Sequence, residues 1–382
     1  MSATHDPAAP SAGRVCLVAM PLMARSGVYR STYDLVAQAR AAGHDWTAVV
    51  GVRPGASGSA PEDADGVREL SVTSHGRAVV DEVGAVLRST PEIQQADHVV
   101  TLITQSDIAM ARSRSQVPGR WSCWVRGLPW PDAGEQTFLR RQLLRRLETS
   151  ALRKADDVWA TTEILAGQIA SARKAAIVPA GIPSAPRTSH GEDADAPLVW
   201  AGRVDDDKRP GFFVELVQAL GARGRVVGEG PLVEPLRATS PASVEWTGWR
   251  APDELWSDAS FYLGTSRREA FGRCAVEAGQ AGLPMVLTDQ YGAAPLLFTD
   301  PGLRERFVLP VDDLPAWTRA VRSLLDDADL RREVSDHVWA NAQQLTIAAS
   351  VDRVLARLTG GPASSAGTAP GRTAPLVEGG AR

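Results

Sequence analysis

The chain has 382 residues, of which 44% are hydrophobic and 23% charged, and its formal net charge is −4. These values are typical of a soluble globular protein and give no electrostatic reason to expect nucleic acid as a partner. The length favours two domains over a single core. Residues 1–13 lack the basic start and apolar centre of a secretory signal, so a cytoplasmic location is expected.

Strand and helix signals alternate along the chain. Short apolar runs predict strands at residues 14–19, 46–52, 99–104, 121–126, 158–161 and 198–202. Helical periodicity predicts helices at residues 31–42, 136–154 and 329–358, and a polar Gly/Ala/Ser stretch predicts a loop at residues 55–66. This alternation is typical of an α/β fold with parallel sheets.

Composition suggests where the domains begin and end. Residues 1–13 and 359–382 are rich in Ala, Pro, Ser, Gly and Thr and are expected to be disordered tails. Pro, Ser, Gly and acidic residues cluster near residues 181–197, which predicts a linker. The expected domains are therefore residues 14–180 and 198–335, followed by a last helix at 336–358.

The most informative segment is residues 266–280, Ser-Arg-Arg-Glu-Ala-Phe-Gly-Arg-Cys-Ala-Val-Glu-Ala-Gly-Gln. It follows an apolar run and leads into an alanine-rich helical stretch, so the order is strand, loop and helix start. A helix N-terminus offers unpaired N–H groups and a positive dipole end, which suit a phosphate. Glu269 and Glu277 accept hydrogen bonds when ionised and suit the hydroxyls of a sugar or ribose. Together they predict a nucleotide-sugar site.

This segment resembles the Glu-seven-Glu signature of retaining glycosyltransferases of the GT-B fold, especially family 4. Three further segments resemble the same family in the same order: residues 26–45 its N-terminal glycine loop and helix, 201–210 its Gly-Arg...Lys segment, and 226–231 its Gly-x-Gly-Pro turn. The resemblance covers roughly residues 14–358. It implies two doubly wound Rossmann-like domains that face each other across a cleft. The first would bind the acceptor and the second the nucleotide sugar, and a C-terminal helix would cross back to the first domain.

The resemblance also implies roles for single residues in the second domain. Arg203 and Lys208 would bind the donor diphosphate, Glu269 the donor sugar and Glu277 the ribose. The phosphate-binding backbone would be that of Phe271, Gly272, Arg273 and Cys274. Two simpler readings stay open: Arg203 and Lys208 could pair locally with Asp205–Asp207, and Glu277 could merely stabilise a helix N-terminus.

In the first domain, Gly27 would let the backbone approach the donor phosphates. Family 4 members commonly carry a histidine at the end of the strand at 121–126, whereas this chain has Arg126. Arginine stays protonated and cannot be a general base. We expect Arg126 to have an anionic partner, either a ligand or a carboxylate such as Asp107 or Asp132, because an unpaired buried cation is costly. The expected catalytic residues are Glu269, Arg126, Arg203 and Lys208.

The predicted reaction is transfer of a sugar from a UDP-, GDP- or ADP-sugar to an acceptor by a retaining, front-side mechanism without metal or cofactor. The acceptor would be a small molecule of specialised metabolism or a glycan. A sugar-nucleotide epimerase of the same fold and a non-catalytic sugar-nucleotide-binding subunit remain alternatives. The arginine-rich helix at 136–154 could sit on an anionic membrane, although such a face is usually just solvated.

Overall fold

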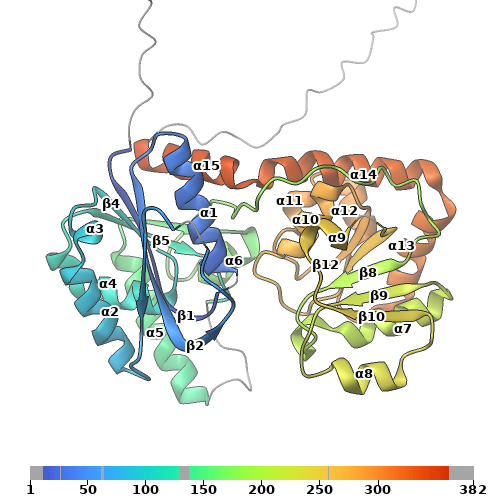
Figure 1. Ribbon diagram of the computed structural model, residues 1–382, viewed down its shortest axis with the longest axis horizontal. Helices are drawn as coiled ribbons and strands as arrows, with labels where there is room; N and C mark the ends of the chain where they lie inside the picture. The colour runs from blue at the N-terminus through green and yellow to red at the C-terminus, as the bar shows by residue number, and fades with distance from the viewer. Residues whose placement is uncertain (1–11, 26, 62–63, 130–136, 257, 361–382) are drawn as a thin grey trace, which may run out of the picture.

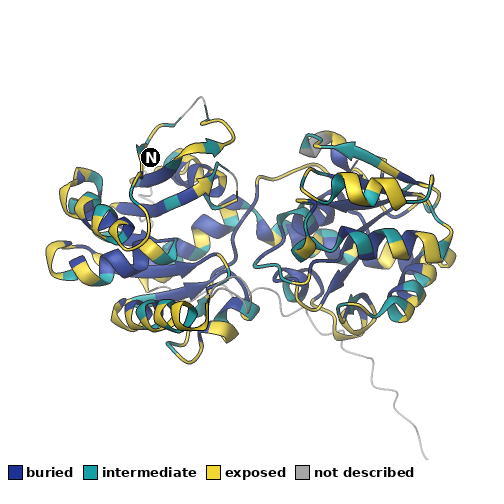
Figure 2. Ribbon diagram, turned by 90° about the horizontal axis from the view of Figure 1, so that it is seen from below, coloured by how far each residue is buried: buried dark blue, intermediate teal, exposed yellow. Residues whose placement is uncertain are grey.

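The computed structural model describes residues 12–25, 27–61, 64–129, 137–256 and 258–360. They form two lobes side by side, each built around one parallel sheet (Figure 1). The buried residues concentrate on the strands and on the inner faces of the helices (Figure 2). The predicted α/β class with two Rossmann-like domains is confirmed. The expected tails fall almost entirely outside the described residues.

The first sheet has the strand order β3-β2-β1-β4-β5-β6-β7. Its strands are β1 (Val15–Ala24), β2 (Trp46–Ser57), β3 (Val67–Ser71), β4 (His98–Thr101), β5 (Arg120–Val125), β6 (Asp157–Ala160) and β7 (Ala176–Ile177). All neighbouring strands pair in parallel. The strand order reverses between β1 and β4, and ligands of such sheets bind at the carboxyl ends of the strands near this point.

Helices cover both faces of the first sheet. They are α1 (Val28–Ala41), α2 (Ala78–Ser89), α3 (Pro91–Gln94), α4 (Thr104–Ser113), α5 (Phe138–Lys154) and α6 (Glu163–Ile169). Helix α1 buries Leu35, Val36 and Ala39 against one face, whereas α2, α4 and α5 contribute to the core on the other.

The second sheet has the equivalent order β10-β9-β8-β11-β12-β13, again all parallel. Its strands are β8 (Leu198–Ala201), β9 (Gly224–Val227), β10 (Val244–Gly248), β11 (Phe261–Gly264), β12 (Met285–Thr288) and β13 (Val308–Leu309). The helices around it are α7 (Pro210–Leu220), α8 (Val233–Thr239), α9 (Pro252–Leu255), α10 (Arg273–Ala281), α11 (Ala294–Leu297), α12 (Pro301–Phe307), α13 (Leu314–Asp326) and α14 (Ala328–Ala342). The order reverses between β8 and β11, so this lobe has its own binding edge.

The last helix returns to the first lobe, as expected. Helix α14 packs on α10, and after a short 3₁₀ turn α15 (Ile347–Thr359) packs on α1 (Figure 1). Along one face of α15, Ile347, Val351, Val354 and Leu358 join the core of the first lobe. Their spacing is that of a helix with one buried face.

The helical periodicity predicted at 329–358 corresponds to two α-helices, α14 and α15, because the helix is interrupted between them. The Thr346 hydroxyl caps α15 by accepting a hydrogen bond from the Ala349 N–H at 3.2 Å. Around the break, the Ile182 N–H donates to Leu345 O at 3.0 Å and the Ile347 N–H donates to Ile182 O at 2.9 Å. The two chain crossings between the lobes are thus hydrogen-bonded to each other, and this pairing takes the place of helical hydrogen bonds.

Other boundaries shift where strand pairing outweighs local composition. Strand β1 continues to Ala24, and Ala24 pairs with Ser57, so β2 extends into the expected loop at 55–66. Helix α5 carries the basic residues as predicted, but Phe138, Leu139 and Leu143 at its start are exposed and do not form an inward apolar stripe. Within the described part of the chain, no helix is long and apolar enough to cross a membrane.

Candidate functional site

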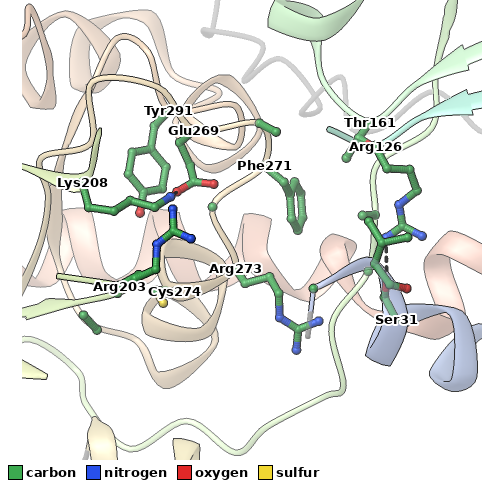
Figure 3. Close-up of a pocket in the computed structure, with 18 residues that line it drawn as sticks. Ser31, Arg126, Thr161, Arg203, Lys208, Glu269, Phe271, Arg273, Cys274 and Tyr291 are labelled. Carbon is green, nitrogen blue, oxygen red and sulfur yellow. Dashed lines mark hydrogen bonds and ion pairs between the residues drawn. The ribbon is translucent and has the colours of Figure 1, made fainter. Parts of the chain in front are cut away.

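A cavity of about 420 Å³ lies between the two lobes. Its walls come from the carboxyl ends of strands in both sheets, with Gly27 after β1 and Arg126 after β5 on one side, and Arg203 after β8 and Glu269 after β11 on the other (Figure 3). The lobes also touch directly, because the Thr162 hydroxyl donates to Ala270 O at 3.1 Å. This is the expected location for a ligand shared by two doubly wound sheets.

The structure gathers nearly all of the predicted site residues around this cavity. The lining includes Gly27, Arg126, Arg203, Lys208, Glu269, Phe271, Gly272, Arg273 and Cys274. Glu277 does not line it. The Glu277 carboxylate lies one turn further along α10, with Oε1 3.6 Å from Arg273 Nη2, and burial raises its pKa.

Lys208 forms an ion pair with Glu269 across the second lobe's binding edge. Lys208 ends a 3₁₀ turn at Asp206–Lys208, which Asp205 caps by accepting from the Lys208 N–H at 3.2 Å. The Thr265 hydroxyl donates to Lys208 O at 3.0 Å and so fixes the turn against the end of β11. Lys208 therefore pairs with the loop acid and not with the acidic turn, which excludes the local-pairing reading for this residue.

Arg203 behaves differently, since its guanidinium pairs with Asp205 two residues away. The Arg203 side chain is 71% exposed and that of Asp205 only 17%, so the guanidinium reaches water at the rim of the cavity. Exposed ion pairs contribute little to stability and exchange partners readily. Arg203 is consequently able to turn toward a ligand.

The loop before α10 is held by backbone hydrogen bonds to the chain after β12. The Gly292 N–H donates to Glu269 O at 2.9 Å, and the Ala293 N–H donates to Phe271 O at 2.7 Å. Helix α10 then begins after Gly272, which has φ 95°. The first N–H bonded within the helix is that of Ala275, to Gly272 O at 3.0 Å. The N–H groups of Arg273 and Cys274 precede it and form the open end of the helix.

The sequence pattern of residues 228–231 favours a tight turn lining the cleft, but this prediction is wrong, because the turn supports the site from behind and none of its residues lines the cavity. Gly228 has φ 136°, and a Cβ there would lie 1.9 Å from Gly202 O. A side chain is therefore excluded by close backbone contact. This packing positions the segment that carries Arg203.

Arg126 is a buried cation at the first-lobe wall, with 8% of its surface exposed. Nη2 donates to the Ser31 hydroxyl at 3.0 Å, and the guanidinium carbon lies 4.6 Å from the centre of the Trp124 ring. Burial, and then the nearby charge of Arg273, lower the pKa of Arg126 to about 9, so it remains protonated at neutral pH. No described carboxylate forms an ion pair with it. The suggested partner Asp107 instead accepts from the Thr101 hydroxyl, and Asp132 is outside the described residues.

Sequence reasoning missed several residues of the cavity wall, among them Ser31, Thr161 and Tyr291. Thr161 and Tyr291 follow strands β6 and β12. Their positions after predicted or apolar strand ends could have marked them as residues of the binding edge. The Tyr291 hydroxyl hydrogen-bonds to that of Tyr262 at 2.7 Å, which anchors its ring beneath Gly272.

A smaller cavity of about 180 Å³ lies behind Arg126 and contains two buried carboxyl groups, Asp107 and Glu148. Burial raises the pKa of Asp107 to about 6. Burial and the neighbouring Asp107 raise the pKa of Glu148 to about 9. The Thr104 hydroxyl donates to Glu148 Oε1 at 2.9 Å. At neutral pH Glu148 is therefore a neutral acid in the folded protein.

This neutral acid predicts a pH-dependent stability. Between about pH 4.5 and 9 folded Glu148 keeps a proton that the unfolded chain has lost, so stability falls as pH rises. From pH 6.5 to 8.5, above the titration of Asp107, the loss should be about 2–3 kcal/mol. Urea unfolding of Glu148→Gln should lack this loss, whereas exposed Glu305→Gln should keep it. Equal slopes in wild type and Glu148→Gln would show that Glu148 is ionised in the folded state.

The second lobe matches a known protein family. Residues 196–327 match the family model described as glycosyl transferases group 1. A comparison with curated proteins finds no match.

Comparison with solved structures identifies the fold of both lobes. A sucrose-phosphate synthase from Thermosynechococcus elongatus superposes with a TM-score of 0.71 at 19% identity, covering 91% of this chain and 99% of the other. HepE from Anabaena, solved in complex with UDP, gives 0.69 at 15% identity, covering 91% and 100%. WaaG, a glycosyltransferase of lipopolysaccharide biosynthesis, gives 0.66 at 18% identity, covering 91% and 100%. The predicted resemblance to GT-B glycosyltransferases is confirmed.

Proposed function

We propose that this group 1 glycosyltransferase of the GT-B fold is a retaining, metal-independent enzyme of the family 4 type. It moves a sugar from a nucleoside-diphosphate sugar to an acceptor hydroxyl. The observation that carries the proposal is the Lys208–Glu269 ion pair beside the open N-terminus of α10, in a cavity shared by both lobes. The cation and the helix end suit a diphosphate, and the acid beside them suits the hydroxyls of the attached sugar.

The donor diphosphate binds between Lys208 and the first N–H groups of α10. Arg203 releases Asp205 and closes over the phosphates as a fork of donors. Gly27, at the start of α1, approaches from the first lobe; it has φ 54° and open space where a Cβ would be. These groups are cationic or hydrogen-bond donors, so they match a ligand that carries negative charge.

Glu269 in the loop and Glu277 in the helix bind the two hydroxyl-bearing parts of the donor, the sugar and the ribose. Glu269 accepts hydrogen bonds from the donor sugar. Glu277, one turn into α10 and outside the cavity lining, accepts those of the ribose at the rim. The nucleotide base is that of a UDP-, GDP- or ADP-sugar. HepE, which shares the fold, is described in complex with UDP-glucose.

Transfer breaks the bond between the anomeric carbon and the leaving phosphate oxygen. Negative charge then grows on the diphosphate, where Lys208, Arg203 and the helix end stabilise it without a metal. The acceptor hydroxyl attacks from the same face and passes its proton to the leaving phosphate oxygen, so the anomeric configuration is retained. The acceptor lies against the first lobe and is a small molecule of specialised metabolism or a glycan.

Two variants test the division of recognition. Glu277→Ala should weaken free nucleoside diphosphate and sugar nucleotide alike, by about 10-fold or more, because both contain the ribose. Glu269→Ala should spare the free diphosphate and reduce turnover. Calorimetric titration of UDP, GDP and ADP, with Glu305→Ala as an exposed control, measures the first effect. Equal losses of diphosphate affinity in both variants would refute the assignment.

A further inference from the structure

Arg126 has an unsatisfied hydrogen-bonding group. Nη2 donates to Ser31, but Nη1 is buried and has no hydrogen-bond partner within the described residues. Leaving such a group unpaired in a protein interior is costly. Asp107 and Glu148 share the smaller cavity with Arg126, yet neither forms an ion pair with it. The described part of the chain thus holds a cation at the wall of the main cavity without completing its hydrogen bonds.

A second arginine reaches the same cavity from the opposite lobe. Arg273 is the first residue of α10, and its side chain extends toward the first lobe, between the Lys208–Glu269 pair and Arg126 (Figure 3). Its charge is, after burial, the next cause that lowers the pKa of Arg126. Two like charges therefore act on each other across this part of the cavity, which is unfavourable unless an anion lies between them.

The charges that line the cavity are unevenly balanced. On the second-lobe side, Lys208 pairs with Glu269 and Arg203 pairs with Asp205. Arg273 has Glu277 at 3.6 Å, whereas Arg126 forms no ion pair with an acid of the described residues. Burial raises the pKa of Asp34, on α1, although the charges of Arg273, Arg30 and Arg126 oppose this shift. Within the described residues no ion pair joins Asp34 to Arg126 or Arg273. The excess of positive charge is therefore greatest at the first-lobe wall, away from the proposed diphosphate site.

We propose that Arg126, Arg273 and the Ser31 hydroxyl form a second anion subsite, which binds a carboxylate or phosphate group carried by the acceptor or by the transferred sugar. The inference rests on the proposed function, because it assigns the donor diphosphate to Lys208, Arg203 and the end of α10. Arg126 supplies the free Nη1, and Arg273 supplies a second guanidinium. Such forks of donors match the geometry of carboxylates and phosphates.

The test begins with the nucleoside diphosphate, UDP, GDP or ADP, that binds the full chain most tightly in calorimetry. With it bound, affinity is measured for inorganic phosphate and for glucose 6-phosphate against glucose. The donors UDP-glucuronate and UDP-glucose are compared separately. Tighter binding of glucose 6-phosphate than of glucose would place the anionic group on the acceptor. Tighter binding of UDP-glucuronate than of UDP-glucose would place it on the transferred sugar. Wild type should prefer an anionic probe by about 10-fold or more, the scale of a charged hydrogen bond.

Arg126→Gln and Arg273→Gln should each remove this preference. Arg126→Gln should also change the affinity for the diphosphate by less than about threefold. Arg126→Lys keeps the charge and should retain part of the preference. Arg304→Gln, which replaces an exposed residue on α12, should retain all of it. The melting temperature of free Arg126→Gln should stay close to that of wild type, because Arg126 forms no ion pair with the described residues.

Two results would overturn the subsite. One is the absence of any preference for phosphate, glucose 6-phosphate or UDP-glucuronate in the wild type. The other is a loss of diphosphate affinity in Arg126→Gln as large as in Lys208→Ala, which would assign Arg126 to the donor phosphates. Failure of every diphosphate to bind would instead contradict the proposed function.

Discussion

Replacing Lys208 with alanine is expected to lower turnover of the donor by about 10²–10³-fold, the usual effect of removing one group that stabilises charge in a transition state. Nucleoside diphosphate affinity should fall by about 10- to 100-fold, since a charged hydrogen bond contributes about 1.5–3 kcal/mol. The loss has two sources. The diphosphate loses a cation, and Glu269 is left as an unpaired carboxylate that repels it.

A double-mutant cycle separates these sources. If Glu269 repels the ligand once Lys208 is gone, Lys208→Ala/Glu269→Gln should recover part of the lost affinity but none of the turnover. The chain offers matched controls, because its other lysines, Lys154 and Lys174, are exposed and do not line the cavity. Lys174→Ala should match wild type in both measurements. Unchanged calorimetric affinity in Lys208→Ala would remove this lysine from the site.

Gly272→Ala is expected to damage both stability and function. A Cβ at Gly272 would lie 2.0 Å from Tyr291 Cε1, and φ 95° already disfavours a side chain. The Tyr291 ring cannot yield easily, because it is buried and its hydroxyl is bonded to Tyr262. Backbone strain and overpacking each cost about 1–3 kcal/mol, so thermal unfolding should show a loss of about 2–5 kcal/mol. Turnover should also fall by about 100-fold, because a displacement on the order of 1 Å misplaces Glu269.

Gly221→Ala is the matched control for this variant. Gly221 ends α7 with φ 64°, and a Cβ there would meet nothing within 4 Å. It shares the left-handed conformation without the clash, so it should cost only about 1–2 kcal/mol. Similar losses in the two variants would mean that the Tyr291 ring moves aside and that the loop is less rigid than its hydrogen bonds suggest.

The architecture could be predicted because it rests on local patterns. Alternating apolar strands and amphipathic helices determine two parallel sheets, and residues that follow strands gather at one edge of each sheet. The cavity residues were predictable for this reason, from Gly27 after β1 to Glu269 after β11. The extension of β1 to Ala24 was not, because its pairing with Ser57 outweighs the turn propensity of the glycines nearby.

Side-chain partners were less predictable than positions. Asp205 lies close in sequence to both Arg203 and Lys208, yet it pairs with Arg203, whereas Lys208 reaches Glu269. That choice depends on the adjacency of β8 and β11 in the sheet, which spacing along the chain does not reveal. The lack of a partner for Arg126 Nη1 among the described residues likewise could not be predicted without the three-dimensional structure, because the sequence offered Asp107 as an equally plausible partner.

The central claim is that this cavity activates a sugar nucleotide without a metal. Its most direct test is to incubate the full chain with UDP-, GDP- and ADP-glucose in EDTA, without acceptor, and to measure the nucleoside diphosphate released. We expect slow release from one of the three donors, with water as the acceptor, unchanged in Lys174→Ala and absent in Lys208→Ala. Release that appears only when magnesium or manganese is restored, or that is equal in wild type and Lys208→Ala, would contradict the account.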